Sequence, residues 1–224
     1  MDDRLMLAAG LYPKCRLGAD IGTDHGFLPC WLLTNNVCER MILSDVSPSA
    51  LSHAEKLVAR KKLSSRAVLV CADGLDAITE KADCISITGM GGELMARMLV
   101  RGADKLQGAV LVLSAHTDLH MVREAVESIG YHLVREELCR AGGRYYLVWK
   151  AEPGASRLTE DERVLGTELL LRGGNPLLPG YLRWRISVTE KKLAGLRSAK
   201  ETDDEAIRTL EHHIAIFKEA HDAC

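Results

Sequence analysis

Apolar residues along this chain follow two patterns, short continuous runs and longer segments in which they recur at every third or fourth position. The continuous runs predict buried parallel strands, at residues 17–21, 40–43, 67–71, 83–88 and 109–113. The periodic segments predict helices, at residues 4–11, 27–33, 49–62, 93–100 and 121–129. Because the two kinds of segment alternate, the pattern indicates an α/β fold built on a doubly wound parallel sheet.

Two further strand-like runs, at residues 131–138 and 144–150, flank the turn Ala141-Gly142-Gly143. A glycine turn between two such runs predicts an antiparallel hairpin. A parallel sheet that ends in an antiparallel hairpin is more typical of methyltransferases with this fold than of dehydrogenases.

The sequence changes character at Glu152-Pro153-Gly154, which divides it into an expected domain of residues 1–152 and a helical domain of residues 153–224. Residues 159–171 predict a helix that ends at the break Gly173-Gly174-Asn175-Pro176. Apolar residues then recur with the spacing of a coiled-coil seam, at Leu182, Ile186, Thr189, Leu193, Leu196, Ile207, Leu210, Ile214 and Phe217. We expect an antiparallel coiled-coil hairpin with its turn near 199–202 and a capping box at Thr202-x-x-Glu205. One long helix is the alternative.

The loop after the first strand indicates the kind of ligand. Residues 22–26 read GTDHG and lie between a strand and a helix, as in the nucleotide-binding unit of doubly wound sheets. Dinucleotide motifs hold a pyrophosphate at this place, but Asp20 and Asp24 would repel one, and the third fingerprint glycine is missing. S-adenosylmethionine carries a sulfonium, an ammonium and a ribose but no phosphate, so we interpret the loop as a methyl-donor site. An ordinary turn with solvated acids is the alternative.

Further candidate residues follow the other strands, where ligands bind in open α/β sheets. Asp45 is expected to bind the ribose hydroxyls, and Asp73, next to Gly74, to accept the amine of the donor adenine, although Asp-Gly is also a common turn. The run Gly89-Met90-Gly91-Gly92 is expected to face the reactive methyl group. His116 falls at the same edge, where a structural or solvated role is the alternative.

Composition narrows the class of protein. The chain has 224 residues, of which 47% are hydrophobic, and its 29 basic and 31 acidic residues nearly cancel. This balance argues against a non-specific DNA binder. The seven cysteines form no C-x-x-C pair, so neither a disulfide framework nor a metal site is expected. No apolar run has membrane-spanning length and no signal pattern is present, which favours a cytoplasmic protein without a membrane partner.

The balanced net charge does not exclude a local basic stripe. Basic residues follow one another along the first expected helix of the hairpin, at Arg183, Arg185, Lys191, Lys192, Arg197 and Lys200. Such a stripe could lie along phosphates. A solvated helix face is the alternative.

Several motifs taken together carry a family resemblance. They are ADIGTDHGFLP at 19–29, Asp73-Gly74, ITGMGG at 87–92, the GG-R-Y-Y hairpin, GNPLL at 174–178 and the C-terminal coiled-coil hairpin. With them, the chain resembles the bacterial tRNA adenine-N1 methyltransferases that act on adenine 22. The resemblance implies a class I (Rossmann-like) methyltransferase domain that binds S-adenosylmethionine, with a helical arm that helps to hold tRNA.

Carried over by position, the resemblance assigns roles to single residues. Asp20, Gly22, Asp24 and His25 would form the donor loop, Asp73 and Gly74 would hold the donor adenine, and Gly89, Met90, Gly91 and Gly92 would line the methyl-transfer site. With Asp45 added to the donor site, the expected substrate contacts are Gly92, Ser114 and, from the basic stripe, Arg183, Arg185, Lys191 and Lys192. Two departures stand out: Ser44-Asp45 replaces the Gly-Glu that members often have, and Ser114-Ala115-His116 replaces Gln-Pro-Asn.

The expected reaction needs little acid or base help, because N1 of adenine has a free lone pair at neutral pH. Alignment would supply most of the catalysis, and the target base must be unpaired or extruded. We expect the catalytic residues Asp24 and His116 to orient its Watson–Crick edge. The protein is expected to act as a monomer, with a weak dimer as the alternative. A methyltransferase for another RNA or a small molecule, and a non-catalytic RNA-binding protein, are the competing hypotheses.

Overall fold

The computed structural model describes residues 1–171, 174–199 and 203–223. The chain forms two compact units, Met1–Arg157 and Leu158–Cys224. The boundary expected after residue 152 falls one residue before the end of the last strand, Arg144–Pro153.

The first unit is a doubly wound α/β sheet, as the alternation of runs predicted. Its strands lie in the order β3-β2-β1-β4-β5-β7-β6, with β1 to β5 parallel and β7 antiparallel to both of its neighbours. The bounds are β1 Cys15–Ile21, β2 Cys38–Asp45, β3 Ala67–Cys71, β4 Cys84–Met90, β5 Val110–Ala115, β6 Tyr131–Ala141 and β7 Arg144–Pro153. From β1 the chain proceeds to β2 and β3 on one side of the sheet, and from β4 to β5 on the other. The carboxyl ends of β1 and β4 therefore mark the switch point where such folds bind ligands.

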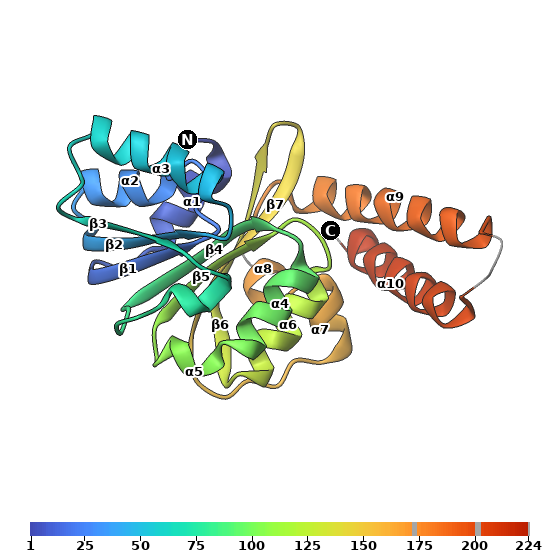
Figure 1. Cartoon of the computed structure of the whole chain (residues 1–224). Helices are drawn as coiled ribbons and strands as arrows, with labels where there is room; N and C mark the ends of the chain where they lie inside the picture. The colour runs from blue at the N-terminus through green and yellow to red at the C-terminus, as the bar shows by residue number, and fades with distance from the viewer. Residues whose placement is uncertain (172–173, 200–202, 224) are drawn as a thin grey trace. The chain divides into compact units, whose positions relative to one another are not determined.

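Helices cover both faces of this sheet (Figure 1). One face is covered by α1 Asp3–Leu11, α2 Phe27–Thr34 and α3 Pro48–Arg60, which share a hydrophobic core through Ala8, Leu32 and Leu57. The other face carries α4 Gly92–Arg101, α5 Ala103–Leu106 and α6 Leu119–Ser128. The sequence patterns did not predict α5 or the short 3₁₀ turn η1 Gly74–Ala77, because elements of four residues are too short to show a period.

Local signals in the sequence account for several element boundaries. Helix α3 begins where the Ser47 hydroxyl accepts from the Ala50 N–H, with Pro48 in the first turn. The β6–β7 hairpin turns at Gly142 and Gly143, whose φ angles of 54° and 79° lie in the region that a two-residue turn of this twist requires. The predicted antiparallel hairpin is therefore confirmed.

One predicted helix of the second unit is wrong in its extent. Residues 159–171 form two short helices, α7 Glu160–Leu165 and α8 Glu168–Leu171. Gly166 separates them with a φ of 129° and a ψ of 161°, a conformation far from helical. Helix α7 starts at a capping box in which Thr159 and Glu162 satisfy each other's backbone N–H.

The rest of the second unit is an antiparallel helical pair, α9 Leu178–Arg197 and α10 Asp204–Asp222. Ion pairs fix the direction, since Arg197 contacts Glu211 and Lys218 contacts Glu190. The single long helix is excluded, because the two helices pack through a core of Leu193, Leu196, Ile207, Leu210 and Ile214.

The start of α10 differs in detail from the expected capping box. Asp203 is its N-cap and accepts from the Ala206 N–H. Thr202, Lys200 and most of the predicted turn at 199–202 lie outside the described residues. Among the helices that the structure describes, none is long and apolar enough to cross a membrane.

Candidate active site

The glycine loop after β1 is held in place by the end of β2. Backbone N–H groups of Gly22 and Thr23 both donate to the Ser44 carbonyl at 2.8 Å. Gly22, Asp24 and Gly26 have φ angles of 75°, 47° and 69°. Glycine adopts this left-handed conformation freely and aspartate tolerates it, which explains why glycine and aspartate occupy these positions of the loop.

Asp45 connects the loop to the second strand. Its Oδ1 accepts from the Ser47 N–H at 2.8 Å, and its Oδ2 accepts from the Asp24 N–H at 3.3 Å. The carboxylate is half-buried, and each oxygen retains lone pairs that can accept from a hydroxyl group. The structure thus brings Asp45 and Asp24 together, and Asp45 also helps to shape the loop.

Asp20 lies beneath the loop rather than on its surface. The side chain is only 4% exposed, and the Ser86 hydroxyl donates to its Oδ1 at 2.6 Å. Burial raises the pKa of this carboxyl group to about 6, against the opposing effects of the Ser86 hydroxyl and the Arg4 cation. A carboxyl group with such a pKa changes charge close to neutral pH.

Asp73 is not an open acceptor. Its carboxylate pairs with Arg101 at 2.7 Å, and the same guanidinium reaches Asp76 at 3.3 Å. The Asp73 side chain remains 64% exposed, so a further amine can approach it. Sequence reasoning missed Arg101; its place in the last turn of α4, the helix opened by the second glycine motif, is the signal that could have suggested it.

The second glycine motif combines a bulge with a close contact between helices. Pairing of β4 with β5 shifts register between Thr88 and Met90, which leaves Gly89 at a φ of 86°. A Cβ on Gly92 would lie 2.2 Å from the Thr117 carbonyl oxygen, and the Gly92 N–H donates to that same oxygen. The buried Gly92 is therefore needed where the chain before α6 crosses α4, and its contact with the substrate stays a prediction.

Ser114 also has a different place from the predicted one. Strand β5 continues to Ala115, so Ser114 lies inside the sheet with no exposed surface. Its hydroxyl donates to the Leu147 carbonyl of β7 at 2.9 Å. The buried Ser114 therefore joins two strands, and its contact with the substrate stays a prediction.

His116 stands at the end of β5, next to residues that the sequence did not single out. Its backbone N–H donates to the Met90 carbonyl at 2.9 Å, and its ring meets the ring of Tyr146 edge-on at 5.5 Å. The guanidinium of Arg4 lies 5.5 Å from the centre of the same tyrosine ring. Desolvation and the charges of Arg4 and Arg144 lower the pKa of His116, so the imidazole is neutral at pH 7.

Sequence reasoning missed Arg4 altogether and noticed Tyr146 only as part of a motif. Arg4 comes from the first helix and Tyr146 from β7, so both reach this edge through tertiary packing. The GG-R-Y-Y motif could have suggested Tyr146, because a hairpin at the end of the sheet brings its residues to the same edge as the glycine loops.

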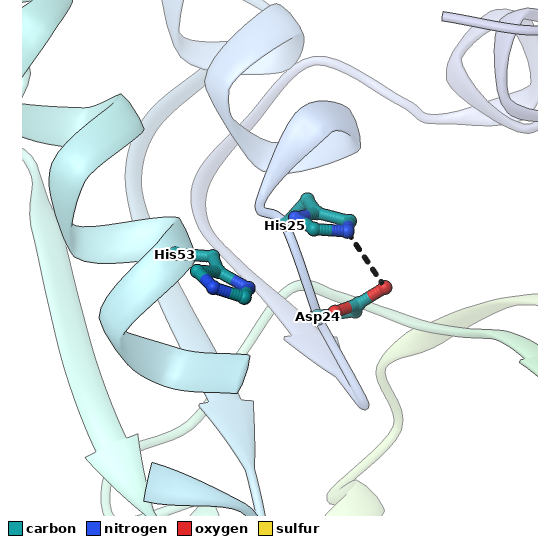
Figure 2. Close-up of side chains that lie close together, drawn as sticks. All are labelled: Asp24, His25 and His53. Carbon is teal, nitrogen blue, oxygen red and sulfur yellow. Dashed lines mark ion pairs between the residues drawn. The ribbon is translucent and has the colours of Figure 1, made fainter. Parts of the chain in front are cut away.

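Asp24, His25 and His53 form an exposed group beside the first loop (Figure 2). The Asp24 carboxylate lies 3.6 Å from Nε2 of His25, and the two imidazole rings stack with their centres 5.0 Å apart. One side-chain N or O atom from each of the three residues lies within 4.8 Å of the others, a spacing at which such atoms can bind one metal ion. The stacked rings are also an ordinary surface contact, and no metal role is assigned to them.

The basic residues of α9 have unequal surroundings. Arg183 and Lys191 are exposed, as is Lys192. Arg185 is half-buried, with its guanidinium 4.7 Å from the centre of the Phe217 ring and its Nη1 donating to the Tyr181 hydroxyl. The predicted stripe is thus interrupted, since Arg185 is engaged with aromatic side chains of its own helical unit.

The site fits a small ligand with amine and hydroxyl groups. Carboxylates of Asp45 and Asp73 offer acceptors, while Gly22 and Gly89 expose backbone that a Cβ would cover. A sheet of this strand order with a glycine loop at its switch point defines a Rossmann-like methyltransferase fold.

Comparison with known proteins gives the family. A family model described as "Methyltransferase domain" matches residues 1–149, and the chain belongs to this family. A curated tRNA (adenine(22)-N(1))-methyltransferase of Bacillus subtilis is 33% identical over 156 residues, which cover 69% of this chain and 66% of the relative. The aligned part therefore spans about two thirds of that relative.

Solved structures extend the likeness to nearly the whole chain. The Bacillus subtilis M1A22 tRNA methyltransferase has a TM-score of 0.86 at 26% identity, with 99% of this chain and 98% of that chain covered. The Streptococcus pneumoniae protein Sp1610, solved in complex with S-adenosyl-L-methionine, has a TM-score of 0.84 at 26% identity, with coverages of 97% and 98%. The predicted C-terminal helical pair therefore belongs to the shared architecture.

Proposed function

We propose that this chain transfers a methyl group from S-adenosylmethionine to N1 of adenine 22 in tRNA. The observation that carries the proposal is the likeness to relatives with this activity in their names, which extends through both units of the chain. The acidic, glycine-rich edge of the sheet supports the donor assignment, because its carboxylates favour a ligand with amine and hydroxyl groups over a diphosphate.

The proposed donor residues surround the switch point. Gly22, Asp24 and His25 contact the donor from the first loop, Asp45 accepts from the ribose hydroxyls, and Asp73 with Gly74 receives the adenine. Gly89, Met90 and Gly91 lie on the side of the reactive group, and Asp20 supports the loop from below. When bound, S-adenosylmethionine supplies a methyl group on a sulfonium that a nitrogen lone pair can attack.

The chain's own residues then have to hold the target adenine. Adenine N1 needs no general base, so alignment is the main source of rate. The neutral imidazole of His116 can accept from the exocyclic amine of the base, while the Asp24 carboxylate favours the positive charge that the ring gains on methylation. The ring of Tyr146, beside His116, offers an aromatic surface on which an extruded base can stack.

A direct assay tests the proposal. Purified protein is incubated with methyl-labelled S-adenosylmethionine and total bacterial tRNA, and the nucleosides are analysed by mass spectrometry. We expect N1-methyladenosine, mapped to position 22. If the protein binds the donor but leaves tRNA unlabelled, the assignment of tRNA as the substrate is wrong and the assignment of the donor site stands.

The role of Asp24 has its own test. Asp24→Asn keeps a residue that tolerates the left-handed backbone but removes the charge, and we expect kcat/KM to fall about 10- to 100-fold. Asp24→Ala should lose at least as much, since alanine also strains the loop. Near-normal kcat/KM in a folded Asp24→Asn protein would overturn the assignment.

A second candidate function rests on His116. Because His116 stands where relatives often have an asparagine, a methyltransferase that acts on another RNA or a small molecule is the alternative. Labelling of total RNA outside tRNA, or of a small-molecule extract, would favour it. In the proposed function the protein acts as a cytoplasmic monomer on tRNA and not on DNA; a weak dimer remains the alternative to test by light scattering.

A further inference from the structure

Arg4 places a positive charge at the candidate site from an unexpected direction. It belongs to α1, which starts at the N-cap Asp2 and packs against β6 and β7. A Cβ built on Gly89 would lie 3.4 Å from Nη1 of Arg4 and 3.7 Å from Nη2. The guanidinium therefore rests directly on the bare backbone of the second glycine motif.

One donor of this guanidinium is left without a partner. Nη1 of Arg4 is buried and makes no hydrogen bond to any residue that the structure describes. The tyrosine ring of Tyr146, 5.5 Å away, interacts with the charge but accepts no conventional hydrogen bond. Buried charged groups almost always have hydrogen-bond partners. A buried N–H without an acceptor at a ligand-binding edge therefore indicates that the ligand supplies the acceptor.

The residues around Arg4 come from the carboxyl ends of three strands. Arg4 affects the pKa of the Asp20 carboxyl group at the end of β1 and of the His116 imidazole at the end of β5. Gly89 belongs to the end of β4. The guanidinium is therefore part of the same edge as the proposed donor loops.

The donor has one anionic group, and the carboxylates proposed so far cannot bind it. Asp24, Asp45 and Asp73 are acceptors for its ammonium, hydroxyl and amine groups, while Asp20 supports the loop from below. We infer that Arg4 binds the α-carboxylate of S-adenosylmethionine through the guanidinium that covers Gly89. This inference rests on the proposed function and completes the match of charges in the donor site.

A carboxylate fits this place better than a phosphate of the RNA backbone does. Nη1 is buried and lies close to the backbone at Gly89, and a guanidinium binds a carboxylate through two parallel hydrogen bonds. A chain phosphate is more readily met by exposed cations such as Lys191. Phosphate binding by Arg4 is therefore an outcome that the experiment must separate.

The experiment compares two ligands that differ only in the carboxylate. Calorimetry measures the binding of S-adenosylmethionine and of its decarboxylated form to the full chain. Wild-type protein should bind the decarboxylated ligand about 10- to 100-fold more weakly. Arg4→Met, which keeps the length of the stem, should weaken S-adenosylmethionine by a similar factor and leave the decarboxylated ligand unchanged.

Controls separate this role from the others. Arg16→Met removes a guanidinium at the opposite end of β1, where Arg16 contacts Glu80, and should leave both affinities unchanged. If Arg4→Met does not fold, Arg4→Lys should keep part of the discrimination between the two ligands. Equal weakening of both ligands by Arg4→Met would mean that Arg4 only supports the fold, and would overturn the inference.

Two other outcomes are distinguishable. If Arg4→Met leaves the donor affinity unchanged but raises the KM for tRNA, Arg4 binds an RNA phosphate. That result would overturn the inference that it binds the donor carboxylate. Failure of the wild-type protein to bind S-adenosylmethionine at all would instead overturn the proposed function, and with it the premise of the inference.

Discussion

Two buried carboxylates of the same sheet have opposite surroundings. Glu136 on β6 is 3% exposed, and its Oε1 accepts from Nε of Arg123 at 3.0 Å and from Nε1 of Trp149 at 2.7 Å. Asp20 on β1 is 4% exposed, but its carboxylate accepts from the neutral Ser86 hydroxyl at 2.6 Å, and Nη1 of the nearby Arg4 makes no hydrogen bond to the described residues. One charge is fully compensated inside the protein, while the other is not.

The difference separates structure from function. A buried charge that is compensated by its own chain fixes the packing of α6 on β6 and β7. A buried charge that is left incompletely compensated lowers stability, and proteins retain such groups at sites where a ligand completes them. The two carboxylates should therefore respond to mutation in opposite ways.

The largest effect is expected from Glu136→Ala. It leaves the Arg123 side chain, which has no exposed surface, without its counter-charge, and breaking a buried pair in this way costs about 3–5 kcal/mol. Urea denaturation should show a lower free energy of unfolding, while the folded protein binds the donor normally. Glu137→Ala, which breaks the more exposed contact with Arg135, should cost less than about 1 kcal/mol. Equal losses in the two variants would contradict the special role of Glu136.

Asp20→Asn should act in the other direction. The asparagine keeps an acceptor for Ser86 but removes the buried charge, so stability at pH 8 should rise or stay level while donor affinity falls about 10- to 100-fold. A loss of stability similar to that of Glu136→Ala would show that the two carboxylates do not differ.

The pH dependence of stability and of donor affinity also tests the role of Asp20. Because the pKa of Asp20 is raised to about 6, its ionisation opposes folding; the penalty is full above pH 6 and vanishes below the usual aspartate pKa near 4. We expect the ionised form of Asp20 to support the proposed donor loop, so donor affinity should fall as the pH falls through 6. In Asp20→Asn this dependence should disappear, and calorimetry between pH 5 and 8 measures it. A retained midpoint near 6 would point to another group.

The parts of this site that the sequence predicted are local ones. The glycine loop and Asp45 follow directly from strand, turn and helix signals within a few residues, and both lie at the expected edge. The acidic loop indicated the methyl donor, the family resemblance added tRNA as the expected substrate, and the comparisons confirm a methyltransferase domain.

The parts that the sequence missed depend on tertiary packing. Arg4 meets Gly89 and His116 only because α1 packs across β6 and β7, and no periodicity encodes that contact. Ser114 and Gly92 were expected at the rim but are buried, since β5 runs two residues further than its apolar run and the chain before α6 crosses Gly92. The extent of a strand and the place where one segment crosses another depend on contacts with residues that are distant in sequence.

The smallest effect extends the comparison to the basic residues of α9. Lys191 is exposed, whereas Arg185 is held over the Phe217 ring at 4.7 Å. If the helix lies along tRNA, Lys191→Ala should weaken tRNA binding a few-fold and lower the slope of log affinity against log salt by about 1. Arg185→Met should leave that slope unchanged and reduce thermal stability, because its guanidinium packs within the helical pair. Filter binding across a salt series measures the first quantity and calorimetry the second. A slope that changes in Arg185→Met but not in Lys191→Ala would mean that the engaged cation, not the open one, contacts RNA, and that burial does not distinguish structural from functional charges in this unit.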